Sequence, residues 1–348
     1  GSLEDANYVF LHVSNTSVFT WNCIMSAHIG LGHDNLAIDL FSTMLKEPIL
    51  PDAITFSTIL QACVHVQDIE RGRAIHSQML VRGLLMDVVI GATLIGFYLV
   101  LGSLDEACWV FNSMSYHDVV SWSAMMKGFL HHQDAHASLA CFHCMCNEGL
   151  IPNNVIILIA FKACTSIKDI AQGMALHDGL SKVGIVFDSH LYSVIIDMYS
   201  KCGYIEDAEI IFEQSSSRRD VAIWGAMING YVVCQKGQLA LGFYQRMLTE
   251  DEGIIPDESM FLCLLKACCT IESIQNCLLI HDHIICMGLE SSVTIGNTLI
   301  DTNAKCGSLF QAHKIFYELR KRDLVTWSTI ISGNVLHGED LHALNLYI

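Results

Sequence analysis

The densest group of potential metal ligands in this chain lies within six residues and comprises Cys141, His143, Cys144 and Cys146. Thiolate and imidazole ligands of this kind suit a soft metal such as zinc. Closed zinc sites usually join two separated pairs of ligands, and the sequence holds no second pair. A helix with partly buried cysteines is the simpler interpretation, since free cysteine behaves as a small hydrophobic residue. We therefore predict that the chain binds neither a metal nor a cofactor.

The remaining reactive residues do not predict an enzyme. The phrase His281-Asp-His283 differs from the zinc-deaminase signature, in which His-x-Glu is followed by Pro-Cys-x-x-Cys. No nucleophile–base pair and no phosphate-binding loop stands out. The fifteen cysteines lack the spacing of a disulfide framework, which fits a reducing compartment. We expect no catalytic activity from this chain and no small-molecule substrate.

Regular repetition dominates the sequence. Trp21, Trp122, Trp224 and Trp327 each stand fourth in a similar phrase, and 101, 102 and 103 residues separate them in turn. An Ala-Cys pair followed by a histidine recurs between them, as Cys63 with His76, Cys164 with His177 and Cys268 with His281. A long period that divides into shorter phrases is typical of repeat architectures.

The period divides into three kinds of unit. We predict nine complete units, preceded by the second half of another unit at 1–17 and followed by a truncated unit at 324–348. The nine are 18–52, 53–87, 88–118, 119–153, 154–188, 189–220, 221–257, 258–292 and 293–323.

The unit 88–118 shows what each of them should look like. An apolar segment from Val88 to Val100 suits a buried helix, and Gly102 ends it. Ser103 and Glu106 then have the spacing of a capping box at a second helix start. One such helix pair cannot bury both of its apolar faces alone, but stacked pairs can. We therefore predict an all-α fold, a right-handed α-solenoid of stacked helix–turn–helix units, with the 52% hydrophobic composition forming one continuous core.

A membrane span is the alternative for the uncharged 17-residue stretch from Val88 to Leu104. A spanning helix needs roughly 20 apolar residues. This stretch contains three glycines, and the equivalent segments 189–205 and 293–309 carry aspartate and lysine. We predict no membrane association.

These phrases resemble the pentatricopeptide repeat family, specifically its plant subclass in which P-, L- and S-type motifs alternate. The tryptophan units, which end in phrases such as Ile-Leu-Pro-Asp52, look like P-type motifs. The Ala-Cys…His units look like L-type motifs. The shorter units, with the phrase Ile195-Ile-Asp-Met-Tyr-Ser-Lys-Cys-Gly203, look like S-type motifs. The resemblance covers essentially the whole chain, which begins and ends inside a unit, so we predict a fragment of a longer array.

The resemblance implies where RNA bases would be read. In the family, the fifth and last residues of a motif read one base of single-stranded RNA, and the second residue flanks it. The base-reading residues carried over are Asn22 with Asp52 and Asn297 with Asp323 for uracil, Ser123 with Asn153 for adenine, Ser193 with Asp220 for guanine, and Ser328 for a purine. The base-flanking residues are Phe19, Val89, Val120 and Val325.

Other units are expected to read poorly. Ala92 with Asp118 and Gly225 with Asp257 lack a polar fifth residue, and Leu158 and Leu262 cannot hydrogen-bond a base. In the family's parallel orientation the expected footprint is 5′-U-n-n-A-n-G-n-n-U-R-3′.

The implied function is sequence-specific binding of single-stranded RNA in mitochondria or plastids. In this subclass it most often specifies C-to-U editing sites, for a deaminase or editing factor supplied by another domain or in trans. A helical scaffold for protein–protein interaction is the alternative. It is favoured by the net charge of −17, because phosphate neutralisation normally supplies much of the affinity for RNA. A basic groove with acidic outer helices would favour RNA, and Asp105, Glu106, Glu206 and Asp207 are expected on the outer helices.

Overall fold

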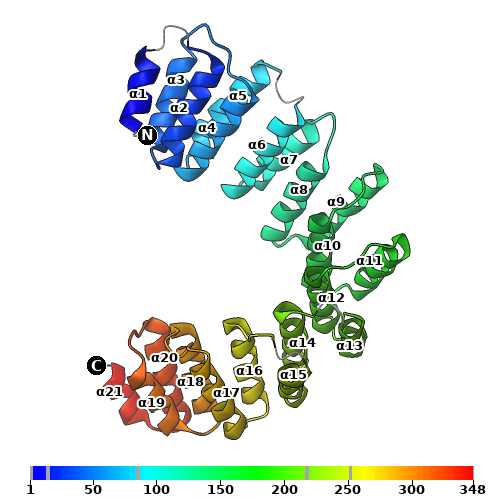
Figure 1. The fold of residues 1–348 in the computed structure, drawn as a ribbon, viewed down its shortest axis with the longest axis vertical. Coiled ribbons are helices and arrows are strands. Elements are labelled where there is room, and N and C mark those ends of the chain that lie inside the picture. The colour runs from blue at the N-terminus through cyan, green and yellow to red at the C-terminus, as the bar shows by residue number, and fades with distance from the viewer. Residues whose placement is uncertain (1–2, 13–15, 84–86, 216–218, 251–252, 348) are drawn as a thin grey trace. The chain divides into compact units, whose positions relative to one another are not determined.

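The computed structural model describes residues 3–12, 16–83, 87–215, 219–250 and 253–347. These residues form 21 α-helices and no strand, which confirms the all-α prediction (Figure 1). Parts of the predicted half-unit 1–17 (1–2 and 13–15), short segments of three predicted units (84–86, 216–218 and 251–252) and residue 348 of the truncated unit lie outside the described residues.

The helices follow one another in pairs after α1 (Leu3–His12). The first helices of the pairs are α2 (Val18–Gly30), α4 (Ala53–His65), α6 (Val88–Val100), α8 (Val119–His131), α10 (Asn154–Ile167), α12 (Ser189–Lys201), α14 (Val221–Val233), α16 (Glu258–Thr270), α18 (Val293–Lys305) and α20 (Leu324–Leu336). The second helices are α3 (Asp34–Met44), α5 (Ile69–Val81), α7 (Leu104–Ser113), α9 (Ala135–Asn147), α11 (Ile170–Val183), α13 (Ile205–Gln214), α15 (Gly237–Glu250), α17 (Ile274–Cys286), α19 (Leu309–Glu318) and α21 (Asp340–Tyr347).

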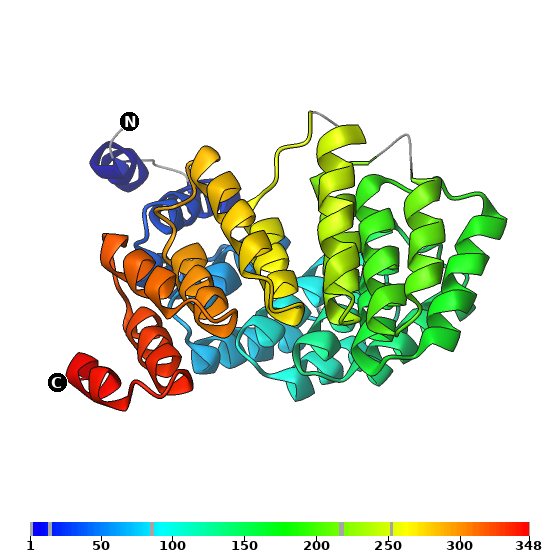
Figure 2. The ribbon, with the colours of Figure 1, turned by 90° about the horizontal axis from the view of Figure 1, so that it is seen from below.

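The chain divides into two compact halves, Gly1–Ala163 and Cys164–Ile348, with the boundary inside α10. Within each half the helix pairs stack in chain order (Figures 1 and 2). First helices pack on the first helices of the neighbouring pairs, for example α12 on α14 and α18 on α20. Second helices pack on the first helix of their own pair and on that of the next pair. The first helices therefore carry most of the packing between repeats, as expected for a solenoid.

The recurring tryptophans join one pair to the next. Each tryptophan ring lies edge-on against a phenylalanine of the preceding second helix, with ring centroids 4.7–4.9 Å apart. Edge-to-face contacts of this kind stabilise a core beyond the area that they bury. The four contacts are Phe10–Trp21, Phe111–Trp122, Phe212–Trp224 and Phe316–Trp327. The regular spacing of the tryptophans thus reflects one contact between neighbouring repeats that recurs along the chain.

The capping box predicted at Ser103 and Glu106 is wrong. The α7 helix does begin at Leu104, but the Ser103 side chain accepts no backbone hydrogen bond there. The Ser103 hydroxyl donates instead to the carboxylate of Glu106. That carboxylate is also bound by the guanidinium of Arg73 from α5, at 3.0 Å from Nε. The glutamate is thus held by the Ser103 hydroxyl and by an inter-repeat ion pair with Arg73, while the Ser103 backbone N–H donates to Tyr98 O.

Two residues of the unit 293–323, Thr302 and Asn303, are fully buried and differ from those at the same places in the sister units 88–118 and 189–220. In the sister units the tyrosine that Asn303 replaces bonds a histidine: Tyr98 OH lies 2.8 Å from His76 Nδ1, and Tyr199 OH 3.1 Å from His177 Nδ1. The Asn303 amide donates to Leu299 O, but its carbonyl oxygen has no partner among the described residues. The replacement of tyrosine by asparagine at this place therefore leaves an unpaired buried acceptor.

Close approach of helices explains two recurring glycines. A Cβ added to Gly72 would lie 1.9 Å from the Phe97 ring, and one added to Gly173 would lie 2.6 Å from Met198 Sδ. The third unit changes both partners, since Cys277 stands at the glycine place and Thr302 at the large one. Both side chains are fully buried. The small threonine leaves room for the cysteine side chain.

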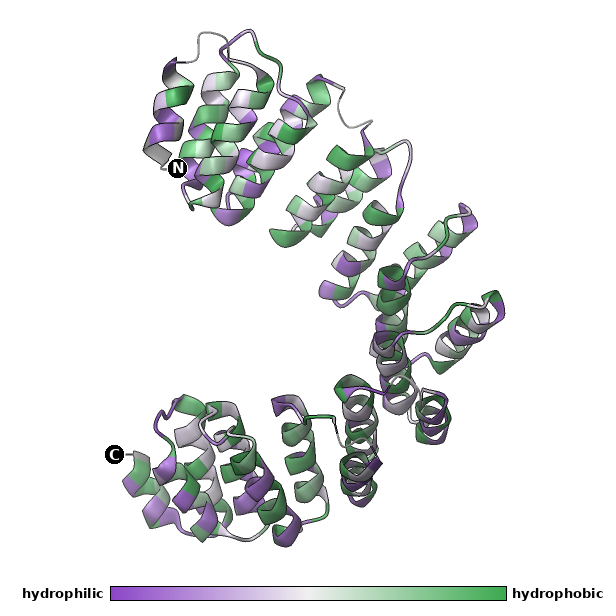
Figure 3. Cartoon of the chain, viewed as in Figure 1, coloured by the Kyte–Doolittle hydropathy of each residue, from purple (hydrophilic) through white to green (hydrophobic). Residues whose placement is uncertain are grey.

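Apolar and polar residues share most helices, while α6 is apolar along most of its length (Figure 3). It has only 13 residues, and no helix in the described ranges has the length and hydropathy needed to cross a membrane. The described residues also contain no group of three or more potential ligands placed to hold a metal ion.

Candidate functional site

The last residue of each predicted unit caps the first helix of the next. Every one of these side chains accepts a hydrogen bond from a backbone N–H in the first turn of that helix, as N-cap residues do. They are Asp52, Asp87, Asp118, Asn153, Asp188, Asp220, Asp257, Ser292 and Asp323. This explains why the last place holds almost only aspartate, asparagine or serine.

Asn22 and Asp52 are brought together by this arrangement. The Asn22 amide donates to Asp52 Oδ1 at 3.0 Å, and the hydroxyl of Thr55 lies 2.7 Å from Asn22 Oδ1 and 2.8 Å from Asp52 Oδ1. Burial acts to raise the pKa of Asp52, but bonds from the Thr55 backbone, the Thr55 hydroxyl and Asn22 outweigh it and lower the pKa. The carboxylate is therefore held ionised, with Oδ2 free of any partner among the described residues.

The second predicted uracil pair, Asn297 with Asp323, repeats the amide–carboxylate bond and the cap. Asn297 donates to Asp323 Oδ1 at 3.2 Å, and Thr326 contributes its backbone N–H and its hydroxyl, each at 2.8 Å. Those bonds from Thr326 and Asn297 lower the pKa of Asp323. Here Asn297 Oδ1 is buried and has no partner in the part of the chain that the structure describes. It is therefore an unpaired buried acceptor, unlike Asn22 Oδ1, which accepts from the Thr55 hydroxyl.

The serines at the fifth place behave differently. Ser123, Ser193 and Ser328 each donate to the carbonyl oxygen three residues earlier in their own helix, at 2.8–2.9 Å. The structure therefore does not join Ser123 to Asn153, or Ser193 to Asp220, by a direct hydrogen bond. Each hydroxyl keeps its acceptor lone pairs, because its single proton is used within the helix.

The predicted flanking residues are exposed apolar side chains. Phe19 is 74% exposed, and Val89, Val120 and Val325 are each more than half exposed. The second residues of the units 53–87 and 154–188, Ile54 and Val155, are also exposed and were not predicted from the sequence. Their place in the unit was sufficient to find them. We call the surface formed by these second-place side chains, the fifth-place residues and the helix caps the first-helix face.

Charge differs between the two sets of helices. The first helices carry five lysines (Lys127, Lys162, Lys201, Lys266 and Lys305) and three acidic residues (Asp197, Glu258 and Asp301). The second helices, which include Asp105, Glu106, Glu206 and Asp207, carry fourteen acidic residues and five basic ones. Cap carboxylates add negative charge at the starts of the first helices, where the helix dipole offsets it. Most of the protein's negative charge within helices therefore lies away from the first-helix bodies.

Two of the first-helix lysines are paired: Lys201 with Asp197 at 2.8 Å and Lys305 with Asp301 at 2.7 Å. Lys127 and Lys266 are exposed and form no ion pair with any described residue. They are cations that remain free to meet an external anion.

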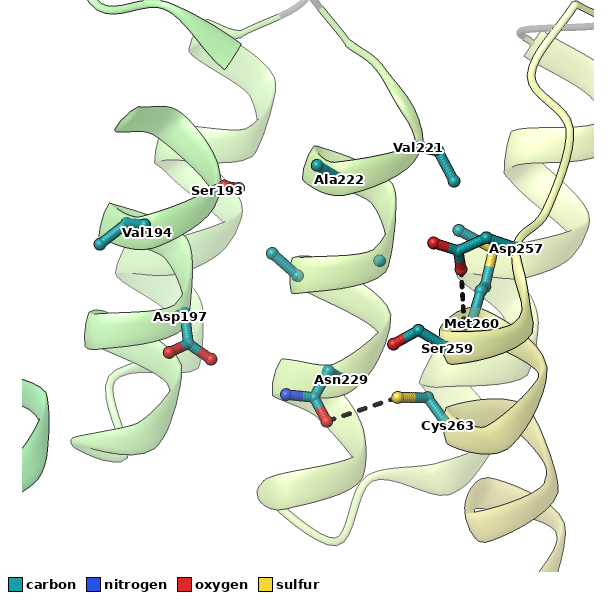
Figure 4. A pocket seen from close by; sticks show the side chains of 12 residues that line it. Ser193, Val194, Asp197, Val221, Ala222, Asn229, Asp257, Ser259, Met260 and Cys263 are labelled. Atoms are coloured by element: carbon teal, nitrogen blue, oxygen red, sulfur yellow. Dashed lines mark hydrogen bonds between the residues drawn. The ribbon is translucent and has the colours of Figure 1, made fainter. Parts of the chain in front are cut away.

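A pocket of about 360 Å³ opens on the first-helix face between α12, α14 and α16 (Figure 4). Among its lining residues are Ser193, Gly225, Asn229, Asp257 and Ser259. One of these, Asn229, had no role in the sequence-based expectation, because it stands ninth in its unit.

Family models of one repeat family match this chain at several places. The PPR repeat family model matches residues 16–65, and the PPR repeat model matches 93–119, 120–150, 190–219, 222–251 and 297–324. Together these ranges cover more than half of the chain.

Curated relatives match along the full chain. One pentatricopeptide repeat-containing protein of Arabidopsis thaliana is 32% identical over 351 residues, covering 100% of this chain and 48% of the relative. A second, named chloroplastic, is 30% identical over 346 residues and covers 99% and 56%. A third, named mitochondrial, is 27% identical over 351 residues and covers 100% and 50%. The chain therefore spans about half the length of the curated relatives it matches.

Solved structures agree on the fold. The pentatricopeptide repeat protein PPR10, crystallised with an 18-nucleotide psaJ RNA element, aligns with a TM-score of 0.65 at 17% identity, covering 100% of this chain and 56% of that one. Yeast Rmd9p, in complex with a 16-nucleotide target RNA, aligns with a TM-score of 0.51 at 9% identity, covering 99% and 85%. From the repeated helix pairs, their phrases and these matches, the chain belongs to the pentatricopeptide repeat family.

Proposed function

We propose that the chain binds single-stranded RNA in a sequence-specific manner along the first-helix face. The observation that carries this proposal is the repeated Asn–Asp pair. In both copies an amide donates to a capping aspartate whose second carboxylate oxygen has no partner among the described residues. An exposed apolar side chain stands close in sequence to each pair, Phe19 before Asn22 and Val325 after Asp323. Such a site can hydrogen-bond the edge of a base and pack against its face, as helical-repeat RNA readers do. PPR10 and Rmd9p, which share the fold, were each solved with RNA.

The proposed register places one nucleotide on each unit. Asn22 with Asp52 and Asn297 with Asp323 select uracil, Ser123 with Asn153 selects adenine, and Ser193 with Asp220 selects guanine. Ser328 favours a purine. The exposed side chains of Phe19, Val89, Val120 and Val325 pack on the bases.

Charge supports this proposal in spite of the acidic composition. Phosphates repel carboxylates, and most helical carboxylates are on the second helices. Lys127 and Lys266, on the first helices, have no acidic partner among the described residues. Affinity then depends on stacking and hydrogen bonds as well as on phosphate contacts.

The finer role that we propose is selection of C-to-U editing sites in mitochondria or chloroplasts. The chain would supply recognition, and a deaminase from another domain or another protein would supply the chemistry. The alternation of P-, L- and S-type units supports this role, and relatives named chloroplastic and mitochondrial support the location.

Binding of the purified chain to 5′-UCCACGGCUA-3′, compared with a scrambled RNA of the same composition, tests the proposal. Fluorescence anisotropy at two salt concentrations should show tighter binding to the designed RNA, with the difference kept at moderate salt. Equal binding to both RNAs contradicts sequence-specific recognition.

A protein-interaction scaffold is the second candidate. It is favoured by a cavity of about 230 Å³ between α15 and α17, the second helices of two neighbouring pairs. Leu248, Leu279 and His283 are among the residues that line it. Pull-down with the chain in the absence of RNA, compared with Leu279→Glu, would test this surface. No change on substitution would argue against it.

A further inference from the structure

The pocket between α12, α14 and α16 owes its space to small residues. Gly225, Ala222 and Ala226 line it on α14. A Cβ added to Gly225 would have a single neighbour within 4 Å, Met260 Cε at 3.9 Å, so no other side chain fills the place of the missing one. The volume of about 360 Å³ is within the range of small-ligand pockets. The fifth place of this unit is therefore an opening, whereas Asn22 fills the equivalent place in the first unit.

The walls beside this opening are also small. The second-place residues on either side are Ala222 and Ser259, both exposed. In six of the other units the same place carries phenylalanine, isoleucine or valine, and in the remaining two it carries His190 and Thr294, all of them larger than Ala222 and Ser259. A pyrimidine would leave part of this wider site empty, and a two-ring purine would make more contacts.

Polar groups in the pocket have unused hydrogen-bonding capacity. Asp257 caps α16 through Oδ1, which accepts from Met260 N at 2.8 Å, and Oδ2 has no partner in the described ranges. Asn229 Oδ1 lies 3.6 Å from Cys263 Sγ and accepts its thiol, which leaves the NH₂ group without a partner among the described residues (Figure 4). At the other end of the pocket, the Asp197 carboxylate is paired with Lys201, and the Ser193 hydroxyl donates to His190 O.

One free carboxylate acceptor and one free amide donor match guanine. Its Watson–Crick edge presents two adjacent donors, N1–H and N2–H₂, next to the O6 acceptor. Adenine has a hydrogen-bond acceptor at N1, which would face the Asp257 carboxylate, also an acceptor, and the two would repel each other. Uracil and cytosine are too small for the opening left by Gly225.

We propose that this pocket binds a purine base, with guanine preferred, and that Asn229 determines the specificity together with Asp257. This inference rests on the proposed RNA-binding function and extends it to the seventh nucleotide, which the polar fifth-place pairs leave unread. Gly225 contributes by its lack of a side chain.

The test uses the RNA series 5′-UCCACGXCUA-3′, with X as each of the four bases, and fluorescence anisotropy with the full chain. We expect X = G to bind about tenfold more tightly than X = U or C, as one well-formed base contact does. Asn229→Ala should remove the preference at X and keep the preference for U over C at the first and ninth nucleotides. Gly225→Asn should create an Asn–Asp pair with Asp257 and move the preference at X from G to U.

Gly242→Asn is the matched control. Gly242 lies in the same unit, on the outer helix α15, is exposed, and an added Cβ would have no neighbour within 4 Å. It should leave all base preferences unchanged.

If the wild-type chain discriminates U from C at the first and ninth nucleotides but binds all four X variants equally, the pocket does not read a base and this inference alone is wrong. If discrimination is absent at every position, the proposed function fails and this inference fails with it. A preference for G that survives Asn229→Ala excludes Asn229 as the determinant.

Discussion

The side-chain amide of Asn22 donates a 3.0 Å hydrogen bond to Asp52, which is also the residue that starts the next repeat's helix. The same carboxylate oxygen accepts from Thr55 N at 2.8 Å. Asp52 therefore performs a structural task and, in our proposal, a recognition task with one side chain. Because one residue has two roles, loss of RNA selectivity on substitution has to be separated from loss of folding.

Asp52→Ala and Asp118→Ala make this separation. Both residues form capping boxes, so each substitution should lower the free energy of unfolding by about 1 kcal/mol. Only Asp52 has a polar fifth-place partner, since Ala92 occupies that place for Asp118. Urea denaturation should show similar losses for the two variants, and anisotropy should show loss of uracil preference at the first nucleotide for Asp52→Ala alone. Equal loss of selectivity in both variants would mean that stability, and not reading, controls binding.

Lys127 and Lys266 should contact phosphates, because they are exposed on first helices without ion-pair partners among the described residues. Replacing either one with glutamine should reduce the slope of log K against log salt concentration by about 0.7, the value for one phosphate of a single strand. Base preferences should stay as they are. Lys314→Gln on the outer helix α19 is the control and should leave the slope unchanged. A slope unaffected by Lys127→Gln would place the RNA backbone elsewhere.

Acid should destabilise the protein through three histidines, of which His76 is buried and His177 and His281 are partly buried. Burial lowers the pKa of His76, His177 and His281 below that of an unfolded chain, about 6.5. As pH falls below that value, the unfolded state takes up protons before the folded state does, so stability present at pH 7.5 is lost progressively through the folded pKa values. Urea midpoints at pH 7.5, 6.5 and 5.5 should fall in that order. His177→Gln should reduce the dependence on pH, and His143→Gln, at an exposed position, should not.

The Cys277 and Thr302 pair should behave as a coupled unit. Thr302→Met alone introduces the residue found at the same place in the sister unit, Met198. Its side chain would clash with that of Cys277, and this overpacking should destabilise the fold by about 1–3 kcal/mol. Cys277→Gly alone removes a buried side chain and adds a helical glycine, and should destabilise it as well. The double variant recreates the arrangement of Gly173 with Met198 and should be more stable than the sum of the single effects predicts. Additive effects would show that the two side chains do not share one space.

Repetition made most of the fold predictable. The tryptophan phrases, the glycines and the cap residues all recur, and the helices begin where those phrases place them. Ser103 shows where local patterns fail: a capping box was expected, but Arg73, from a helix of the preceding pair, holds Glu106. The role proposed for Asn229 could not be predicted from the sequence either. It depends on the small residues that line the pocket around Asn229 and not on the place of Asn229 in the repeat.

Because the last-place side chain must start a helix, the choice of residue there is restricted before any RNA is selected. A substitution that improved base recognition but could not accept an N–H bond would destabilise the following repeat. The residue types that can occupy this place are therefore limited to the few side chains that cap helix N-termini. New base specificities should evolve more readily through substitutions at the fifth place. There Asn22, Ser193 and Gly225 show that the backbone imposes no comparable restriction.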